Sequence, residues 1–297
     1  MSAHPDIKAP ADASRLPMTL PRLFEKKRLG EPIVMVTAYD YPSARAAEAA
    51  GVDLVLVGDS AGTTILGHTS TTPVEIDELL VLARAARRGL HGPLLIGDLP
   101  FGSYEISDEQ AVRSALRFIK EAGCDCVKLE GGGEVSLSRA KAIIGAGIPV
   151  MGHVGLTPQT SVSLGGWKAQ GRTAAAAERI AREALALQEA GCFSIVFEAI
   201  PSAVAAAIMP RMEIPVIGIG AGPTPDGQVL VFHDLLGIRD GLGPRFVKRY
   251  ANLQQEMNEG VAAYAEDVRT HRYPGPEHGY SIEDGELEAF RDALASL

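Results

Sequence analysis

Several apolar segments of this sequence end in polar residues whose side chains could do chemistry. The segment 53–59 contains a run of β-branched and other apolar residues and ends in Gly58 and Asp59, with Ser60 directly after it. Such a run predicts a strand buried on both faces, as in a parallel sheet. Ligand sites of α/β proteins collect at the carboxyl ends of parallel strands. We therefore expect Asp59 and Ser60 to belong to a functional site.

The same pattern recurs further along the chain. Four more apolar segments end in an acidic or imidazole side chain, and these are Asp98, Glu130, His153 and Glu198. Because the carboxyl ends of parallel strands lie at one edge of a sheet, these side chains are predicted to meet around one polar site.

Three of these residues could hold a metal ion. Asp59, Asp98 and Glu130 follow successive predicted strands, and carboxylates that lie close together repel one another unless a cation sits among them. Mg²⁺ suits such a site because it prefers oxygen ligands and keeps positions for water or substrate. One carboxylate alone could as well be a helix N-cap or half of a surface ion pair, but three in succession favour a metal site.

The other polar residues suggest a cation and a base. Lys128 and Glu130 are two apart on one strand and so face the same side. A buried Lys128 could simply pair with Glu130, or it could hold a substrate carboxylate or stabilise an enolate. Glu198 has apolar neighbours and is a candidate general base. His153 could be a hydrogen-bond donor to a ligand or a core histidine with its own partners, and the sequence favours neither.

A metal, a cation and an opposed carboxylate indicate a class of reaction. A 2-oxo acid can chelate Mg²⁺ through its carboxylate and keto oxygens, which polarises the carbonyl and acidifies the adjacent C–H. A carboxylate base then removes that proton, and the resulting enolate attacks an electrophile. The residues alone identify neither the oxo acid nor the electrophile.

The elements that must position these residues alternate between strands and helices. The predicted strands are 33–39, 53–59, 93–98, 126–130, 149–154, 194–198, 215–220 and about 229–232, with helices between the first seven and a final helix over about 245–269. About eight uninterrupted β/α alternations favour an α/β fold of the (β/α)8 TIM barrel type over an open doubly wound sheet. The first strand is not followed by a dinucleotide-binding Gly-x-Gly-x-x-Gly motif.

We expect three segments: a flexible arm over 1–18, a barrel domain over 19–280, and an extension over 281–297 with a small helix near 284–296. The irregular stretch 155–173 is long enough to be a binding loop or lid. Glycines 218, 220 and 222 follow the seventh predicted strand, where they could bind phosphate or allow close packing.

Composition narrows the class of protein. The 297 residues are 46% hydrophobic and 22% charged, as in an ordinary globular protein, and the net charge of −9 argues against a nucleic-acid partner. No apolar run reaches the roughly 18–20 residues of a membrane span. The three cysteines, Cys124, Cys126 and Cys192, are expected to be buried thiols of a cytoplasmic protein.

From about Thr19 to Tyr280 the chain resembles the ketopantoate hydroxymethyltransferase family. The motifs that carry the resemblance are Thr37-Ala-Tyr-Asp-Tyr41, Val57-Gly-Asp-Ser60, Asp98-Leu-Pro-Phe101, Val127-Lys-Leu-Glu-Gly131, Gly152-His-Val-Gly-Leu-Thr-Pro-Gln159, Gly165-Gly-Trp-Lys-Ala-Gln-Gly-Arg172, Gly218-Ile-Gly-Ala-Gly222 and Asp226-Gly-Gln228. One departure is that Glu130 is followed by three glycines where the family usually has two.

The resemblance implies a barrel of the phosphoenolpyruvate/pyruvate superfamily type. It implies Mg²⁺-dependent transfer of a hydroxymethyl group from 5,10-methylenetetrahydrofolate to the enolate of 3-methyl-2-oxobutanoate, giving 2-dehydropantoate for pantothenate and coenzyme A biosynthesis. Matching motifs make Asp59, Asp98 and Glu130 the Mg²⁺ site. They make Asp59, Ser60, Asp98 and Lys128 the contacts to the oxo acid, and Glu198 the proton acceptor, with His153 a possible accessory residue.

The resemblance also implies a cytoplasmic homo-oligomer, commonly a decamer, with the loop 155–173 bordering the folate site. Two other functions fit parts of the pattern. One is a related barrel lyase that cleaves a C–C bond in an oxo or hydroxy diacid, and the other is a barrel that only binds a metabolite or supports an oligomer. The full set of polar strand ends argues against a mere scaffold.

Overall fold

The computed structural model describes residues 16–239, 241 and 243–297, so most of the expected N-terminal arm lies outside the described residues. The chain divides into two compact units, one up to Tyr250 and the other from Ala251 onward. The second unit contains α10 (Leu253–Arg269), the short 3-10 turn η3 (Pro276–His278) and α11 (Asp284–Ala295). The division falls inside the span 19–280 that the sequence assigns to one domain, and the domain boundaries stay a prediction.

The first unit is built on a closed barrel of eight parallel strands. They are β1 (Ile33–Thr37), β2 (Leu54–Val57), β3 (Leu94–Asp98), β4 (Cys126–Lys128), β5 (Val150–Gly155), β6 (Ser194–Glu198), β7 (Val216–Ile219) and β8 (Gly227–Leu230). Each strand pairs with the next in the sequence, and β8 pairs with β1. The predicted TIM barrel is therefore confirmed, and an open sheet is excluded because β1 and β8 close the ring.

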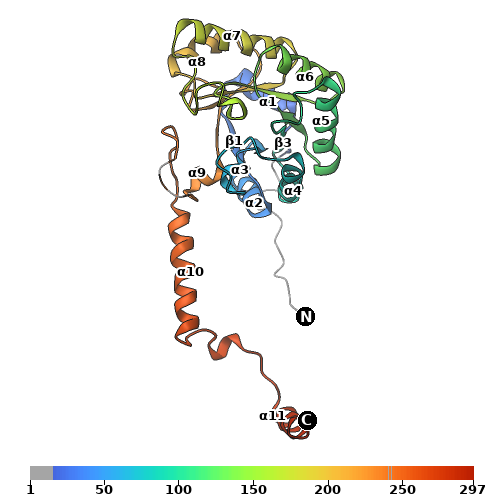
Figure 1. Ribbon diagram of the computed structural model, residues 1–297, viewed down its shortest axis with the longest axis vertical. Helices are drawn as coiled ribbons and strands as arrows, with labels where there is room; N and C mark the ends of the chain where they lie inside the picture. The colour runs from blue at the N-terminus through green and yellow to red at the C-terminus, as the bar shows by residue number, and fades with distance from the viewer. Residues whose placement is uncertain (1–15, 240, 242) are drawn as a thin grey trace. The chain divides into compact units, whose positions relative to one another are not determined.

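Helices cover the outside of the barrel. They are α2 (Tyr41–Ala50), α4 (Ile76–Arg87), α5 (Asp108–Ala122), α6 (Glu134–Gly145), α7 (Ala174–Glu189) and α8 (Ser202–Ile208). Helices α4, α5 and α6 pack side by side in chain order (Figure 1). The other elements of this unit are α1 (Leu20–Leu29), α3 (Ala61–Thr64), α9 (Phe232–Leu236), and the 3-10 turns η1 (Pro158–Thr160) and η2 (Met209–Arg211).

The predicted alternation fails between β7 and β8, because residues 220–226 turn back without forming a helix. Gly220 and Gly222 have φ of +65° and +82°, a conformation that other residues rarely adopt. A Cβ on Gly220 would lie 2.6 Å from the ring of Phe246, and one on Gly222 would lie 2.5 Å from Ser202. Of the two readings of these glycines, the structure supports close packing.

Two apolar cores follow from the alternation of side chains along the strands. An outer core lies between strands and helices, and an inner core fills the barrel. The inner core includes Ile96, Cys126, Met151 and Val196. Two positions further along the same strands lie Asp98, Lys128, His153 and Glu198. Because side chains alternate with a period of two, these polar side chains also face the inside of the barrel, at the carboxyl ends of the strands.

The amino-terminal end of the barrel is closed by α1. Its Leu23 is fully buried and belongs to the inner core. Lys26 of α1 pairs with Asp53 at 3.0 Å, and Lys27 pairs with Asp226 at 2.8 Å. The opposite, carboxyl-terminal end is left for a ligand site.

Two other expectations concern the cysteines and membranes. All three cysteines are buried and free of disulfides, as predicted. Among the helices of the described ranges, none is both long and apolar enough to cross a membrane.

Candidate active site

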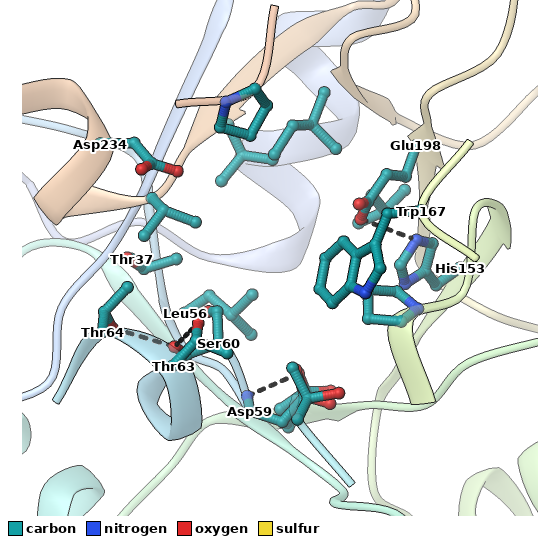
Figure 2. Close-up of a pocket in the computed structure, with 18 of the residues that line it drawn as sticks. Thr37, Leu56, Asp59, Ser60, Thr63, Thr64, His153, Trp167, Glu198 and Asp234 are labelled. Atoms are coloured by element: carbon teal, nitrogen blue, oxygen red, sulfur yellow. Dashed lines mark hydrogen bonds and ion pairs between the residues drawn. The ribbon is translucent and has the colours of Figure 1, made fainter. Parts of the chain in front are cut away.

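A pocket of about 490 Å³ opens at the carboxyl ends of the strands. All seven polar residues singled out in the sequence line it: Asp59, Ser60, Asp98, Lys128, Glu130, His153 and Glu198. Figure 2 shows Glu198 and His153 on one side of this pocket, and Ser60, Thr64 and Asp234 on the opposite side. The polar side chains that the sequence predicts to meet at one site therefore do line one pocket.

Asp59 and Asp98 are buried side by side. The backbone N–H of Asp59 donates to Oδ2 of Asp98 at 3.2 Å. Burial, and then the charges of Asp98 and Glu130, hold the pKa of Asp59 well above its usual range. Burial also raises the pKa of Asp98, although the ammonium of Lys128 opposes this. Two carboxyl groups in this state favour the approach of a cation.

Lys128 is the cation closest to these carboxylates. Its Nζ lies 2.6 Å from Oδ1 of Asp98 and 3.8 Å from Oε1 of Glu130. The main partner is therefore Asp98 on the neighbouring strand, not the Glu130 that sequence spacing suggested. Burial acts to lower the pKa of Lys128, but the charges of Asp98, Glu130 and Asp59 outweigh it and raise the pKa, so the side chain stays an ammonium.

His153 lies between two carboxylates. Its Nδ1 is 3.4 Å from Oε1 of Glu130, and its Nε2 is 3.3 Å from Oε2 of Glu198 (Figure 2). These contacts are ion pairs, since neither ring nitrogen has a well-aligned hydrogen-bond partner among the described residues. Burial acts to lower the pKa of His153, but contact with Glu130 and Glu198 raises it to about 9, which makes the ring an imidazolium at neutral pH.

The same contact affects Glu130. Burial favours its protonated form, but the close contact with the charged His153, together with the charge of Lys128, lowers its pKa. The structure shows His153 as a buried histidine that links Glu130 to Glu198.

The backbone around Glu198 is strained in a way that aims its side chain. Ala199 has φ of +49°, a left-handed conformation that is unusual for a residue with a Cβ. Its N–H donates to the carbonyl of Ile219 at 2.8 Å, and its carbonyl accepts from the N–H of Gln170 at 2.9 Å. Such local strain concentrates at functional sites because it orients a neighbouring side chain.

Ser60 is held by a buried tyrosine. The hydroxyls of Tyr39 and Ser60 are 2.8 Å apart. Burial raises the pKa of Tyr39 to about 12, so the phenol stays neutral. The Ser60 hydroxyl therefore has a fixed neighbour at the edge of the pocket.

Sequence reasoning missed several residues of the site. Thr37, Asp234 and Arg239 also line the pocket, and Trp167 reaches it from the long loop 155–173. Gln159 contacts the carboxylates of Asp59 and Glu130, and Tyr104 contacts Gln159. Gln159 stood inside a motif already noted, and Trp167 is the only tryptophan of the chain, but nothing in the sequence distinguished Tyr104.

The carboxylates of the pocket supply the kind of oxygen ligand that Mg²⁺ prefers. Across residues 16–239, 241 and 243–297, no group of three or more His, Cys, Asp and Glu side chains is arranged to hold a metal ion. Mg²⁺ is commonly bound through only one or two carboxylates, with waters and substrate completing the shell. Asp59 and Asp98, buried, adjacent and with raised pKa values, fit that pattern, while the three-carboxylate set with Glu130 stays a prediction.

Known proteins show similarity at two levels. The model of a family described as ketopantoate hydroxymethyltransferase matches residues 17–276. An Arabidopsis thaliana protein named 3-methyl-2-oxobutanoate hydroxymethyltransferase 1, mitochondrial, is 51% identical over 94% of this chain and 82% of its own. The 3-methyl-2-oxobutanoate hydroxymethyltransferase of Moorella thermoacetica is 50% identical over 90% of this chain and 99% of its own.

Solved structures share the fold at low identity. Phosphonopyruvate hydrolase in complex with oxalate and Mg²⁺ aligns with a TM-score of 0.56 at 14% identity, over 94% of this chain and 97% of that one. The 2,3-dimethylmalate lyase, described as a member of the PEP mutase/isocitrate lyase superfamily, aligns with a TM-score of 0.54 at 15% identity, over 94% and 100%. At this level of identity, the likeness shows a shared barrel fold and nothing more.

Proposed function

This chain belongs to the ketopantoate hydroxymethyltransferase family, and we propose on that basis that it transfers a hydroxymethyl group from 5,10-methylenetetrahydrofolate to 3-methyl-2-oxobutanoate. The product is 2-dehydropantoate, an intermediate of pantothenate and coenzyme A biosynthesis. The observation that carries the proposal is the identity of about half of all residues, over most of both chains, to relatives that bear this activity as their name.

The metal site of the proposal consists of Asp59 and Asp98, with Glu130 as the third predicted ligand. When bound there, Mg²⁺ would neutralise the buried carboxylates and polarise the carbonyl of the oxo acid. The raised pKa values of Asp59 and Asp98 support this assignment, because a cation would relieve the cost of burying both groups as anions.

The remaining residues act on the oxo acid directly. Lys128 and Ser60 border the pocket beside Asp59 and Asp98, where they would bind the substrate carboxylate. Glu198, across the pocket, accepts the proton from C3, and the C–H electron pair becomes the enolate. Water adds to the methylene carbon of the folate, both C–N bonds break, and tetrahydrofolate leaves with the two protons of the water on its nitrogens. The enolate carbon then forms the new C–C bond with the carbonyl carbon so released, and the resulting alkoxide takes up a proton to give the hydroxymethyl group. His153, charged and in contact with Glu198, orients that carboxylate.

Three finer points belong to the same proposal. The folate would lie against the loop 155–173, which is supported by Trp167 in the pocket lining. The oligomer would be a decamer, which sedimentation velocity would test. The location would be the cytoplasm, which the three free, buried thiols support and which cell fractionation would test, since the Arabidopsis relative is named as mitochondrial.

The first experiment follows the C3 proton of 3-methyl-2-oxobutanoate by NMR in D₂O, with protein and Mg²⁺ but without folate. We expect the proton signal to disappear through deuterium exchange and EDTA to abolish the loss. Absence of exchange both without folate and after addition of tetrahydrofolate would refute enolisation of this substrate.

The lyase alternative has no observation in its favour beyond the shared fold. The likeness to 2,3-dimethylmalate lyase is too distant in sequence to carry an activity. Cys126 begins β4 and so lies at the end of that strand opposite the pocket, which removes it as a catalytic group. A hydroxy diacid offered in the same NMR tube should remain uncleaved.

A further inference from the structure

Gln159 is a buried amide that contacts both sides of the proposed metal site. It sits in η1, at the start of the long loop 155–173, and is 5% exposed. Its Nε2 donates to Oδ2 of Asp59 at 3.0 Å, and its backbone N–H donates to Oε2 of Glu130 at 3.1 Å. A single residue, four positions beyond the end of β5, therefore contacts the carboxylates that follow β2 and β4.

The hydrogen bonds of Gln159 fix the orientation of its amide. Nε2 also donates to the carbonyl of Leu99 at 3.0 Å, while Oε1 accepts from the hydroxyl of Tyr104 at 2.7 Å. The reversed amide would set an oxygen against the Asp59 carboxylate and the Leu99 carbonyl, both of which only accept. The pattern therefore allows one orientation, in which both amide hydrogens and the amide oxygen are used.

Tyr104 forms a hydrogen-bonded brace together with Gln159. Its hydroxyl donates to Gln159 and accepts from the backbone N–H of Glu130 at 3.3 Å. The Tyr104 backbone is held in turn, because its carbonyl accepts from Nε of Arg139 at 2.9 Å. Tyr104 is 4% exposed, so water does not compete for these contacts.

We propose that Gln159 and Tyr104 are positioning residues that set the separation and orientation of Asp59 and Glu130 for metal binding. This inference rests on the proposed function, because it assumes that these carboxylates hold Mg²⁺. Buried carboxylates that repel one another would otherwise rotate apart, and the brace holds them at a fixed spacing before the metal arrives. Partners that orient ligands in this way commonly account for about 10- to 100-fold in metal affinity.

The test measures Mg²⁺ binding to the full chain by calorimetry, without substrate, for wild type, Gln159→Leu and Tyr104→Phe. We expect Gln159→Leu to weaken binding by about 10- to 100-fold, and Tyr104→Phe by a smaller factor, because the amide keeps one anchor at Leu99. Tyr39→Phe is the matched control. It removes a buried hydroxyl beside the same pocket, but that hydroxyl contacts Ser60 and not Gln159, so Mg²⁺ affinity should stay within about twofold of wild type.

A second readout separates positioning from general damage to the fold. Excess Mg²⁺ should restore kcat of Gln159→Leu towards the wild-type value if the variant is folded and only its metal affinity is reduced. Tyr104→Phe keeps the ring and its packing, so it remains informative should Gln159→Leu fail to fold.

The outcomes distinguish this inference from the proposed function. If the folded variants bind Mg²⁺ as tightly as a wild type that itself binds it, the positioning role is refuted and the proposed function is untouched. If wild type neither binds Mg²⁺ nor exchanges the C3 proton, both the proposed function and the positioning role of Gln159 and Tyr104 are refuted.

Discussion

At the scale of single residues, the pocket is organised as buried charges in which each carboxylate has a partner. Asp98 contacts Lys128, and Glu130 and Glu198 contact the two nitrogens of His153. A buried charge is tolerated when it is paired, and removal of one partner leaves the other exposed to the full cost of burial. This reasoning leads to two predictions.

Replacement of Lys128 by methionine should destabilise the fold. Lys128→Met leaves Asp98 buried without its counter-ion, a change that commonly costs about 3–5 kcal/mol of unfolding free energy. Arg113→Met is the matched control, because Arg113 and its partner Glu109 are 76% and 75% exposed and should contribute almost nothing. Urea denaturation of both variants measures the difference, and equal losses would contradict the assignment of Lys128 to a buried pair.

Replacement of Glu198 by glutamine should stop the proposed proton abstraction. Glu198→Gln keeps the size of the side chain but cannot accept the C3 proton, so the rate of deuterium exchange should fall by about 10²- to 10⁴-fold. Because Glu198 lies across the pocket from Asp59, Mg²⁺ affinity should change by less than about twofold (Figure 2). Exchange at the wild-type rate would remove Glu198 from the role of base.

At the scale of elements, the position of the proposed metal site depends on how helices pack on strands. Gly97 of β3 precedes Asp98 and faces α5, where Phe118 is fully buried. A Cβ on Gly97 would lie 2.3 Å from Cδ1 of Phe118. Helix α5 therefore approaches β3 as closely as a glycine permits. We infer that this contact helps to fix the position of Asp98 along the barrel axis.

Substitution of Gly97 by alanine should be costly. Gly97→Ala forces the Phe118 ring to move and should lower the free energy of unfolding by about 1–3 kcal/mol. In the double variant with Phe118→Leu, the smaller side chain should accept the methyl group, so the two effects should be non-additive in urea denaturation. Strictly additive effects would show that the two positions do not compete for space.

At the scale of the whole molecule, the barrel has two apolar cores and two different ends. Leu23 of α1 closes the amino-terminal end, and the polar pocket occupies the other. The cysteines lie in these cores, with Cys126 in the inner core and Cys124 and Cys192 in the outer one. Because burial raises the pKa of a thiol, the free energy of unfolding of the barrel should depend on pH.

Burial should make stability fall in alkaline solution. It raises the pKa of Cys192 from 9.0 to about 12, so this thiol contributes stability below pH 9 that is lost as pH rises through 12. Between pH 8 and pH 10, wild type should therefore lose more unfolding free energy than Cys192→Ala, which has no thiol to ionise. Urea denaturation of both proteins at the two pH values checks this, and identical losses would contradict a buried Cys192.

The fold and the membership of the pocket could be read from the chain alone because both depend on local patterns. Apolar runs that end in polar residues predicted the strands, and the position of Asp98, Glu130 and Glu198 at strand ends predicted one shared site. The closed barrel and the shared pocket confirm these expectations. The metal and catalytic roles of the residues stay predictions.

The partners of those residues were decided by the tertiary structure. Sequence spacing suggested Glu130 as the partner of Lys128, but Asp98 on the adjacent strand is closer. The brace formed by Gln159 and Tyr104 had no local signal either, whereas the glycines and prolines between β7 and β8 do mark a turn. The physical reason is that strand register and side-chain rotamers in a packed interior depend on neighbours distant in sequence, which no short stretch of residues encodes.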